Sequence, residues 1–479
     1  MSSVAERAEG RDRSDGPRLL RTALAALLTR GALLPVALLQ GALLARGLGP
    51  AGLGQYSAAL LDVNLAVAIL SLGLPGGLAV VAGQARAQAG RAQGHRMLAA
   101  LQRAALRHGL WITVAVATLW ALTRVPGLPV ATWLGRPPGV LSIVAGMVIL
   151  QFARDVHNSL LWGGQRFAAQ NRINVAVQLL LSIALATLWA QGALSAAAAL
   201  GLQLCGHAVW IAGARWAARQ IVEPSLASIA TGADADLGER AGGGPADGES
   251  DDAAARARRM GLRNYVGVLL ELLLFRIDVY LIEKLLPAAR MASDLGLYQA
   301  GVRIAELVLL VPSTLNAVLF AKAAAREQVA AATVRSAKLA LWVGLAALAG
   351  MALCGRPLLV LFFGARFGGS FAPCLWVLAG CVATCFSGPL AGTLSGDRGY
   401  PHSILWAQAV ALLVNVGANL FLLPRHGIVG AAMASTVAYA VSALWISTAF
   451  ARRYGLSMWT LLRPEWPWTL WRTLAAPEA

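Results

Sequence analysis

This 479-residue sequence has little charge. Asp, Glu, Lys and Arg make up 13% of the residues, whereas hydrophobic residues make up 58% and the mean hydropathy is +0.63. Soluble globular domains are about one quarter charged. The composition therefore argues against a soluble protein and predicts a polytopic α-helical membrane protein. Lysine is especially scarce, with only Lys284, Lys322 and Lys338 beside abundant Arg, Ala and Gly, which points to a bacterial genome of high GC content.

Cysteine is also scarce, with five residues, most of them inside apolar runs. Cys381 and Cys385 share a helix face at spacing i,i+4, but two thiols do not supply the four ligands of a zinc site. We interpret the cysteines as small buried hydrophobic residues. The glycine-rich run AGGGPADG (residues 241–248) follows no strand and precedes no Lys-Ser/Thr pair, so it is not a phosphate-binding loop. We predict no metal, no cofactor and no catalytic residues.

The net charge of +17 does not indicate nucleic-acid binding. Arginines lie in short loops between apolar runs, where they set membrane topology, and they form no stripe that follows a phosphate backbone. Loops on one predicted side of the membrane are much richer in arginine than loops on the other. The positive-inside rule therefore places both termini in the cytoplasm. The Arg-rich start precedes a long apolar run without a convincing cleavage site, which predicts a membrane helix and not a signal peptide.

Twelve apolar runs are long enough to cross a bilayer, which needs about 20 residues. Their approximate limits are 22–45, 57–83, 104–123, 140–162, 173–191, 194–213, 264–286, 297–320, 338–363, 371–394, 403–423 and 428–450. Between the sixth and seventh runs lies an acidic, Gly- and Ala-rich stretch without apolar periodicity, which predicts disorder. The predicted domains are a cytoplasmic tail (1–21), a six-helix lobe (22–214), a disordered cytoplasmic linker (215–260), a second six-helix lobe (261–453) and an interfacial cytoplasmic tail (454–479).

The two halves resemble each other in sequence. LGQYSAAL (Leu53–Leu60) matches LGLYQAGV (Leu295–Val302), GQR after the fourth run matches GDR after the tenth, and QGALSAAAA matches HGIVGAAMA before the last run of each half. Three matches in the same order indicate an internal repeat. Because each half has six spans, both halves start from the same side of the membrane and form parallel repeats.

These stretches resemble a known family. Residues 297–324 (LYQAGVRIAELVLLVPSTLNAVLFAKAA), 396–440 and 45–60 are similar to the polysaccharide flippases that export O-antigen and exopolysaccharide units. Those flippases belong to the multidrug/oligosaccharidyl-lipid/polysaccharide exporter superfamily, together with MATE exporters and lipid II flippases. The resemblance runs from about Leu24 to Tyr454 without the linker, and it rests on hydropathy and small residues.

The resemblance implies a MATE-like fold of two parallel-repeat lobes in the bacterial inner membrane. It also implies translocation of a polyprenyl-pyrophosphate-linked oligosaccharide by alternating access, coupled to H⁺ or Na⁺. Membrane lipids and the glycan polymerase or glycosyltransferases of the same pathway are the expected partners. The resemblance further implies that the first two helices of each lobe line a shared cleft.

Charged residues within the predicted spans are the candidate site, because each costs about 2.5–3.5 kcal/mol at the bilayer centre. Guanidinium groups bind phosphate through charge-assisted hydrogen bonds, so the candidate substrate-binding residues are Arg30, Arg154, Arg276 and Arg303. Carboxylates near arginines suit an ion switch, so the candidate ion-coupling residues are Asp62, Asp278 and Glu306. The alternative for each is a structural ion pair, such as Arg303 with Glu306 at i,i+3, or Arg276 with Asp278 or Glu283.

Two other functions remain open. A MATE-type exporter of drugs or cations would share the fold, but a cationic cavity argues against a cationic substrate. A membrane-embedded glycan polymerase or ligase needs sizeable outer loops with arginine or histidine near the acceptor, and the outer loops here are short and poor in charge. We therefore expect a transporter and not an enzyme.

Overall fold

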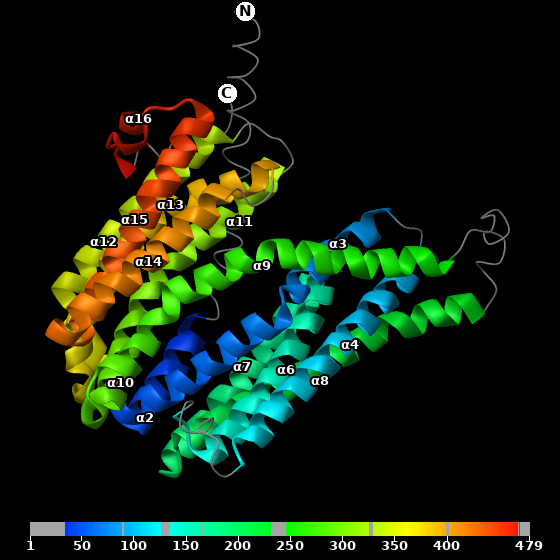
Figure 1. Cartoon of the computed structure of the whole chain (residues 1–479), viewed down its shortest axis with the longest axis horizontal. Helices are drawn as coiled ribbons and strands as arrows, with labels where there is room; N and C mark the ends of the chain where they lie inside the picture. The colour runs from blue at the N-terminus through cyan, green and yellow to red at the C-terminus, as the bar shows by residue number, and fades with distance from the viewer. Residues whose placement is uncertain are drawn as a thin grey trace, which may run out of the picture. The chain divides into compact units, whose positions relative to one another are not determined.

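The computed structural model describes residues 34–88, 91–125, 135–163, 166–230, 246–324, 329–398, 402–467 and 469. Every regular element in these ranges is helical, which confirms the predicted all-α class (Figure 1). In these ranges ten helical stretches are long and apolar enough to cross a membrane. A helix satisfies its own backbone hydrogen bonds, which hydrocarbon cannot do for it, so long apolar runs take this form.

The chain divides into two compact units. One unit is Ala59–Leu269, and the other combines the chain up to Ala58 with the stretch from Leu270 onward. Both boundaries fall inside long helices, α2 (Leu34–Ser71) and α9 (Ala246–Leu285), so each of these helices contributes to both units.

The Ala59–Leu269 unit packs around α6. Its other helices are α3 (Leu74–Gln88), α4 (Arg91–Leu122), α6 (Pro138–Gly163), α7 (Phe167–Ala190) and α8 (Ala196–Ala230). Helix α6 packs against α3, α4 and α8, and α7 packs against α8. The backbone of α3 also packs directly against the backbone of the first half of α9. A Cβ atom on Gly77 would lie 1.9 Å from the carbonyl oxygen of Ala257.

The other unit packs around α13 (Phe371–Arg398). Its further elements are α10 (Ala288–Ala305), the 3-10 helix η2 (Glu306–Leu309), α11 (Leu310–Ala324), α12 (Ala330–Phe363), the 3-10 helix η3 (Ala365–Ser370), α14 (His402–His426), α15 (Ile428–Tyr454) and α16 (Met458–Leu462). Helix α13 packs against α10, α11, α12 and α15, and α14 packs against α15.

The beginning of the described chain differs in detail from the predicted spans. Helix α2 continues through the position where a loop was expected, with a kink at Gly49, whose φ of 64° is open to glycine, followed by Pro50. It ends at Ser71, and α3 starts after a turn at Leu72 and Gly73.

The predicted linker is partly helical in the described chain. Helix α8 continues to Ala230 and α9 begins at Ala246, so both extend into residues 215–260. Residues 231–245 lie outside the described ranges. Helix α9 also covers the predicted seventh span, but its charged residues keep it out of the ten apolar stretches. Charged residues within a membrane-spanning helix indicate a functional site, so α9 is the candidate element.

Candidate functional site

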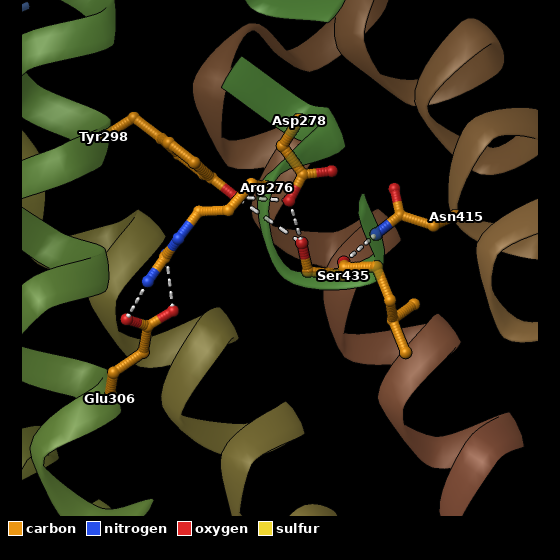
Figure 2. A network of polar contacts seen from close by, with 7 residues as sticks. Arg276, Asp278, Tyr298, Glu306, Asn415 and Ser435 are labelled. Atoms are coloured by element: carbon orange, nitrogen blue, oxygen red, sulfur yellow. Dashed lines mark hydrogen bonds and ion pairs between the residues drawn. The ribbon is translucent and has the colours of Figure 1, made fainter. Parts of the chain in front are cut away.

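Asp278 on α9 is the centre of a buried polar network. Only 1% of its surface is exposed. Its Oδ2 atom accepts hydrogen bonds from the Tyr298 hydroxyl, at 2.7 Å, and from the Ser435 hydroxyl (Figure 2). Its Oδ1 atom accepts one from Asn419 Nδ2 at 2.8 Å. All of these donors are neutral. The carboxylate is therefore solvated by hydroxyl and amide groups, as a group that exchanges a small cation would need.

Two amide side chains on α14 extend this network. Asn415 and Asn419 are one helical turn apart, with Asn419 Nδ2 2.5 Å from Asn415 Oδ1. Asn415 Nδ2 donates to the carbonyl oxygen of Leu274 at 3.4 Å, and Asn419 Oδ1 is buried without a hydrogen-bond partner among the described residues. Carboxylate, amide and hydroxyl oxygens thus converge here, and such oxygens are the ligands preferred by hard cations.

The network differs from a transition-metal site. Among the described residues, no group of three or more His, Cys, Asp or Glu side chains is arranged to hold a metal ion. Any cation at Asp278 would depend on one carboxylate and neutral oxygens, which suits a weakly held monovalent cation or a proton.

Arg276 and Glu306 form a bidentate ion pair beside this network. Arg276 Nη1 lies 2.7 Å from Glu306 Oε1, and Arg276 Nη2 lies 2.8 Å from Glu306 Oε2 (Figure 2). The side chains are 33% and 20% exposed, respectively. Glu306 is the first residue of η2, a 3-10 turn between α10 and α11. Short 3-10 stretches within long helices often mark hinges, and the ion pair joins α9 to this stretch.

Arg303, one turn before Glu306, has different partners. Its Nη2 atom donates to the Ser57 hydroxyl at 3.2 Å, and its guanidinium carbon lies 6.0 Å from the centre of the Tyr56 ring. The spacing of Arg303 and Glu306 allowed an ion pair between them, but Glu306 is bound by Arg276 instead. Among the described residues, no carboxylate oxygen forms a salt bridge with Arg303.

Two repeat-related tyrosines reach the site because two glycines let α2 and α10 touch. A Cβ atom on Gly54 would lie 1.9 Å from the Ala292 carbonyl oxygen, and one on Gly296 would lie 1.8 Å from the Pro50 carbonyl oxygen. Each glycine is followed two residues later by a tyrosine. The Tyr56 ring faces the guanidinium group of Arg303, and the Tyr298 hydroxyl donates to Asp278. The Gly-x-Tyr repeat in the sequence therefore builds both halves of this site.

Other sequence-predicted residues belong to the Ala59–Leu269 unit. Asp62 accepts a hydrogen bond from Arg136 Nε at 2.9 Å. Arg154 Nη1 lies 3.2 Å from His207 Nδ1, and its guanidinium carbon lies 5.9 Å from the centre of the Trp210 ring. Arg30 lies outside the described residues.

Sequence reasoning missed the neutral members of the network, which are Tyr298, Asn415, Asn419 and Ser435. A signal existed for two of them, since LLVNVGANLF places two asparagines at i,i+4 in an apolar span. Buried amides in such a span need partners, and here Asn419 donates both to the Asp278 carboxylate and to the side-chain oxygen of Asn415. Ser435 carries no comparable signal, because a serine in a helix often bonds its own backbone.

The architecture is that of the transporters and flippases of the MATE-like fold. A structure of a multidrug resistance MATE family transporter of the MOP superfamily, in an inward-facing conformation, matches with a TM-score of 0.64 and 16% identity, covering 88% of this chain and 95% of that chain. Lipid II flippase MurJ, in an inward closed conformation, matches with a TM-score of 0.65 and 11% identity, covering 92% of this chain and 89% of that chain.

An outward-facing MATE transporter of the same superfamily also matches, with a TM-score of 0.56 and 15% identity over 93% of this chain and 98% of that chain. No family model matches the sequence, and a search of curated proteins finds no significant match. The structural matches confirm the MATE-like fold that the sequence resemblance implied.

Proposed function

We propose that the protein is a membrane flippase that moves a polyprenyl-pyrophosphate-linked oligosaccharide to the outer leaflet of a bacterial inner membrane. The observation that carries the proposal is Arg303, a guanidinium within a membrane-spanning stretch whose partners are a hydroxyl and an aromatic ring. A pyrophosphate bound there would offset the cost of burying the cation through charge-assisted hydrogen bonds. The structural similarity to lipid II flippase MurJ supports a flippase function.

Arg276 completes the head-group site by exchanging partners. Arg303 lies one helical turn before Glu306, which is bound by Arg276. A phosphate near Arg303 would compete with Glu306 for the two N–H groups of Arg276, because phosphate and carboxylate bind the same guanidinium edge. Release of Glu306 would free the start of η2, and the substrate would thereby favour a different conformation of the helix that follows.

Coupling to H⁺ or Na⁺ takes place at Asp278 in this proposal, with Glu306 as the second coupling residue. Asp278 and Arg276 are two residues apart on α9, while Tyr298 and Glu306 are both supplied by the α10–η2 stretch. A cation that replaces the Tyr298 hydrogen bond would therefore act on the same two elements that carry the ion pair. Asp62, held by Arg136, and Arg154, held against His207, then serve to order the Ala59–Leu269 unit.

The wider mechanism follows from the repeat. Two six-helix lobes, residues 22–214 and 261–453, alternately open the site to the cytoplasmic and the outer side. The arginine-rich loops support a cytoplasmic location for both termini in this proposal, and glycosyltransferases would deliver the lipid-linked substrate on that side. A glycan polymerase on the outer side would consume the product.

A MATE-type cation or drug exporter is the second candidate. The observation that favours it is Asp278, a buried carboxylate without a basic partner among the described residues, which is suited to a cation. The multidrug transporters of the same fold also support it. The arginines argue against it, because they would repel a cationic drug from the same helices.

The test is glycan export by cells that depend on this protein. Arg276→Ala and Arg303→Ala should each lower export at least about 10-fold, because each removes a charged hydrogen bond worth about 1.5–3 kcal/mol. Arg290→Ala, an exposed arginine near the start of α10, is the matched control and should export normally.

Membrane insertion of each variant is measured by quantitative blotting of the membrane fraction. Normal export by both site variants at normal protein levels would contradict the flippase proposal. Efflux of cationic dyes that survives in the arginine variants but is lost in Asp278→Asn would support the exporter instead.

A further inference from the structure

The chain after α15 forms an ordered segment at residues 455–467. It starts at Gly455, whose φ of 64° turns the chain, and Ser457 then caps α16 by accepting a hydrogen bond from the backbone N–H of Thr460 at 3.1 Å. Leu461, on α16, is 1% exposed and belongs to the core cluster that contains Phe450. The segment is therefore part of the folded unit.

Contacts with α12 fix the second half of this segment. Glu465 Oε1 lies 2.5 Å from Lys338 Nζ, and the Glu465 carbonyl oxygen accepts a hydrogen bond from Trp342 Nε1 at 2.8 Å. The Trp342 and Trp466 rings are stacked, with centroids 6.5 Å apart. Through this ion pair the ammonium group of Lys338, which is 5% exposed, neutralises Glu465, the one acidic residue among residues 455–467.

The outer side of the segment combines apolar and cationic groups. Trp459, Leu462 and Trp466 are 72%, 58% and 75% exposed. Arg452, in the last turn of α15, and Arg463 are also exposed. In water this much exposed tryptophan surface is unfavourable, whereas the indole ring favours the boundary between lipid tails and headgroups. The charge here is positive once Glu465 is neutralised.

The position of the segment in the chain fits such a boundary. Helix α15 has 27 residues, which at about 1.5 Å per residue spans about 40 Å. A bilayer measures about 40–45 Å with its headgroups, so residues that directly follow α15 lie at headgroup depth. The arginines then meet lipid phosphates while the tryptophans reach the start of the acyl region.

We propose that residues 452–467 form a docking surface for anionic glycerophospholipid headgroups. Arg452 and Arg463 bind the phosphates, Trp459 and Trp466 insert at the headgroup boundary, and the Lys338–Glu465 pair holds the surface against α12. Negative lipids are preferred over zwitterionic lipids because basic residues near the membrane are attracted to an anionic surface. This surface is independent of the flippase proposal and would exist in any transporter built on this chain.

The test uses the purified full-length protein in a neutral detergent with added phosphatidylglycerol or phosphatidylcholine. Bound lipids are counted by native mass spectrometry of the monodisperse fraction. We expect the unaltered protein to retain more phosphatidylglycerol than phosphatidylcholine. Arg463→Gln combined with Trp459→Ala should lose at least half of that excess.

The matched control combines Arg290→Gln with Leu413→Ala, one exposed arginine and one exposed apolar residue elsewhere in the same unit. It should keep the full phosphatidylglycerol excess. If the double variant does not fold, Arg463→Gln alone is used, because no hydrogen bond or ion pair of its side chain joins it to the described residues. Equal retention of the two lipids, or an unchanged excess in a folded surface variant, would overturn the proposal.

Discussion

Removing the negative charge of Glu306 leaves the guanidinium group of Arg276 without a carboxylate partner among the described residues, and Arg303 nearby has no such partner either. Breaking one side of a buried ion pair costs about 3–5 kcal/mol. Because the Arg276 side chain keeps 33% exposure, water stabilises part of its charge, and we expect Glu306→Gln to cost about 2–3 kcal/mol. Arg276→Gln should cost a similar amount, since it leaves the Glu306 carboxylate unpaired.

The double variant distinguishes an ion pair from two independent residues. With glutamine at both positions no uncompensated charge of the pair remains, so the cost should be less than the sum of the single costs by at least about 1.5 kcal/mol. Adding Arg303→Met to Glu306→Gln should also recover stability, because it removes the second positive charge. The Arg303→Met variant by itself should be close to neutral.

The measurement is equilibrium unfolding of the purified full-length protein by titration with sodium dodecyl sulfate, followed by tryptophan fluorescence. Arg290→Gln controls for the loss of a positive charge at an exposed site. If the two single costs add to within about 0.5 kcal/mol in the double variant, the residues are not coupled. The partner exchange proposed for substrate binding would then have no energetic basis.

Two further predictions concern ion coupling and helix packing. Asp278→Asn should remove at least about 90% of the stimulation of transport by an imposed Na⁺ or H⁺ gradient in proteoliposomes, because a neutral amide cannot bind the ion by charge; full stimulation in this variant would exclude Asp278 as the coupling site. Gly77→Ala should destabilise the protein by about 1–3 kcal/mol through overlap with the Ala257 carbonyl. The neighbouring Gly76→Ala, where a Cβ atom has no neighbour within 4 Å, should be neutral or stabilising by up to about 1 kcal/mol; equal unfolding midpoints for the two variants would refute the close packing of α3 on α9.

The charged members of the site could be found from the sequence because charge is rare in apolar spans. Arg276, Asp278, Arg303 and Glu306 each stand out for this reason. Their partners could not be found in the same way. Spacing identifies neighbours on one helix, such as Arg303 and Glu306, whereas the observed pair joins Arg276 to a residue 30 positions away on another element.

The sequence by itself determined the helical class and the approximate position of most spans, and it revealed the internal repeat, because hydropathy and periodicity are local properties of a chain in lipid. It also identified α9 and α10 as the charged helices. The tertiary structure decided which of those charges meet. The contact of α2 with α10 at Gly54 and Gly296 places Tyr56 under Arg303 and Tyr298 on Asp278. Such contacts depend on where helices cross, which is fixed by packing between residues distant in the chain.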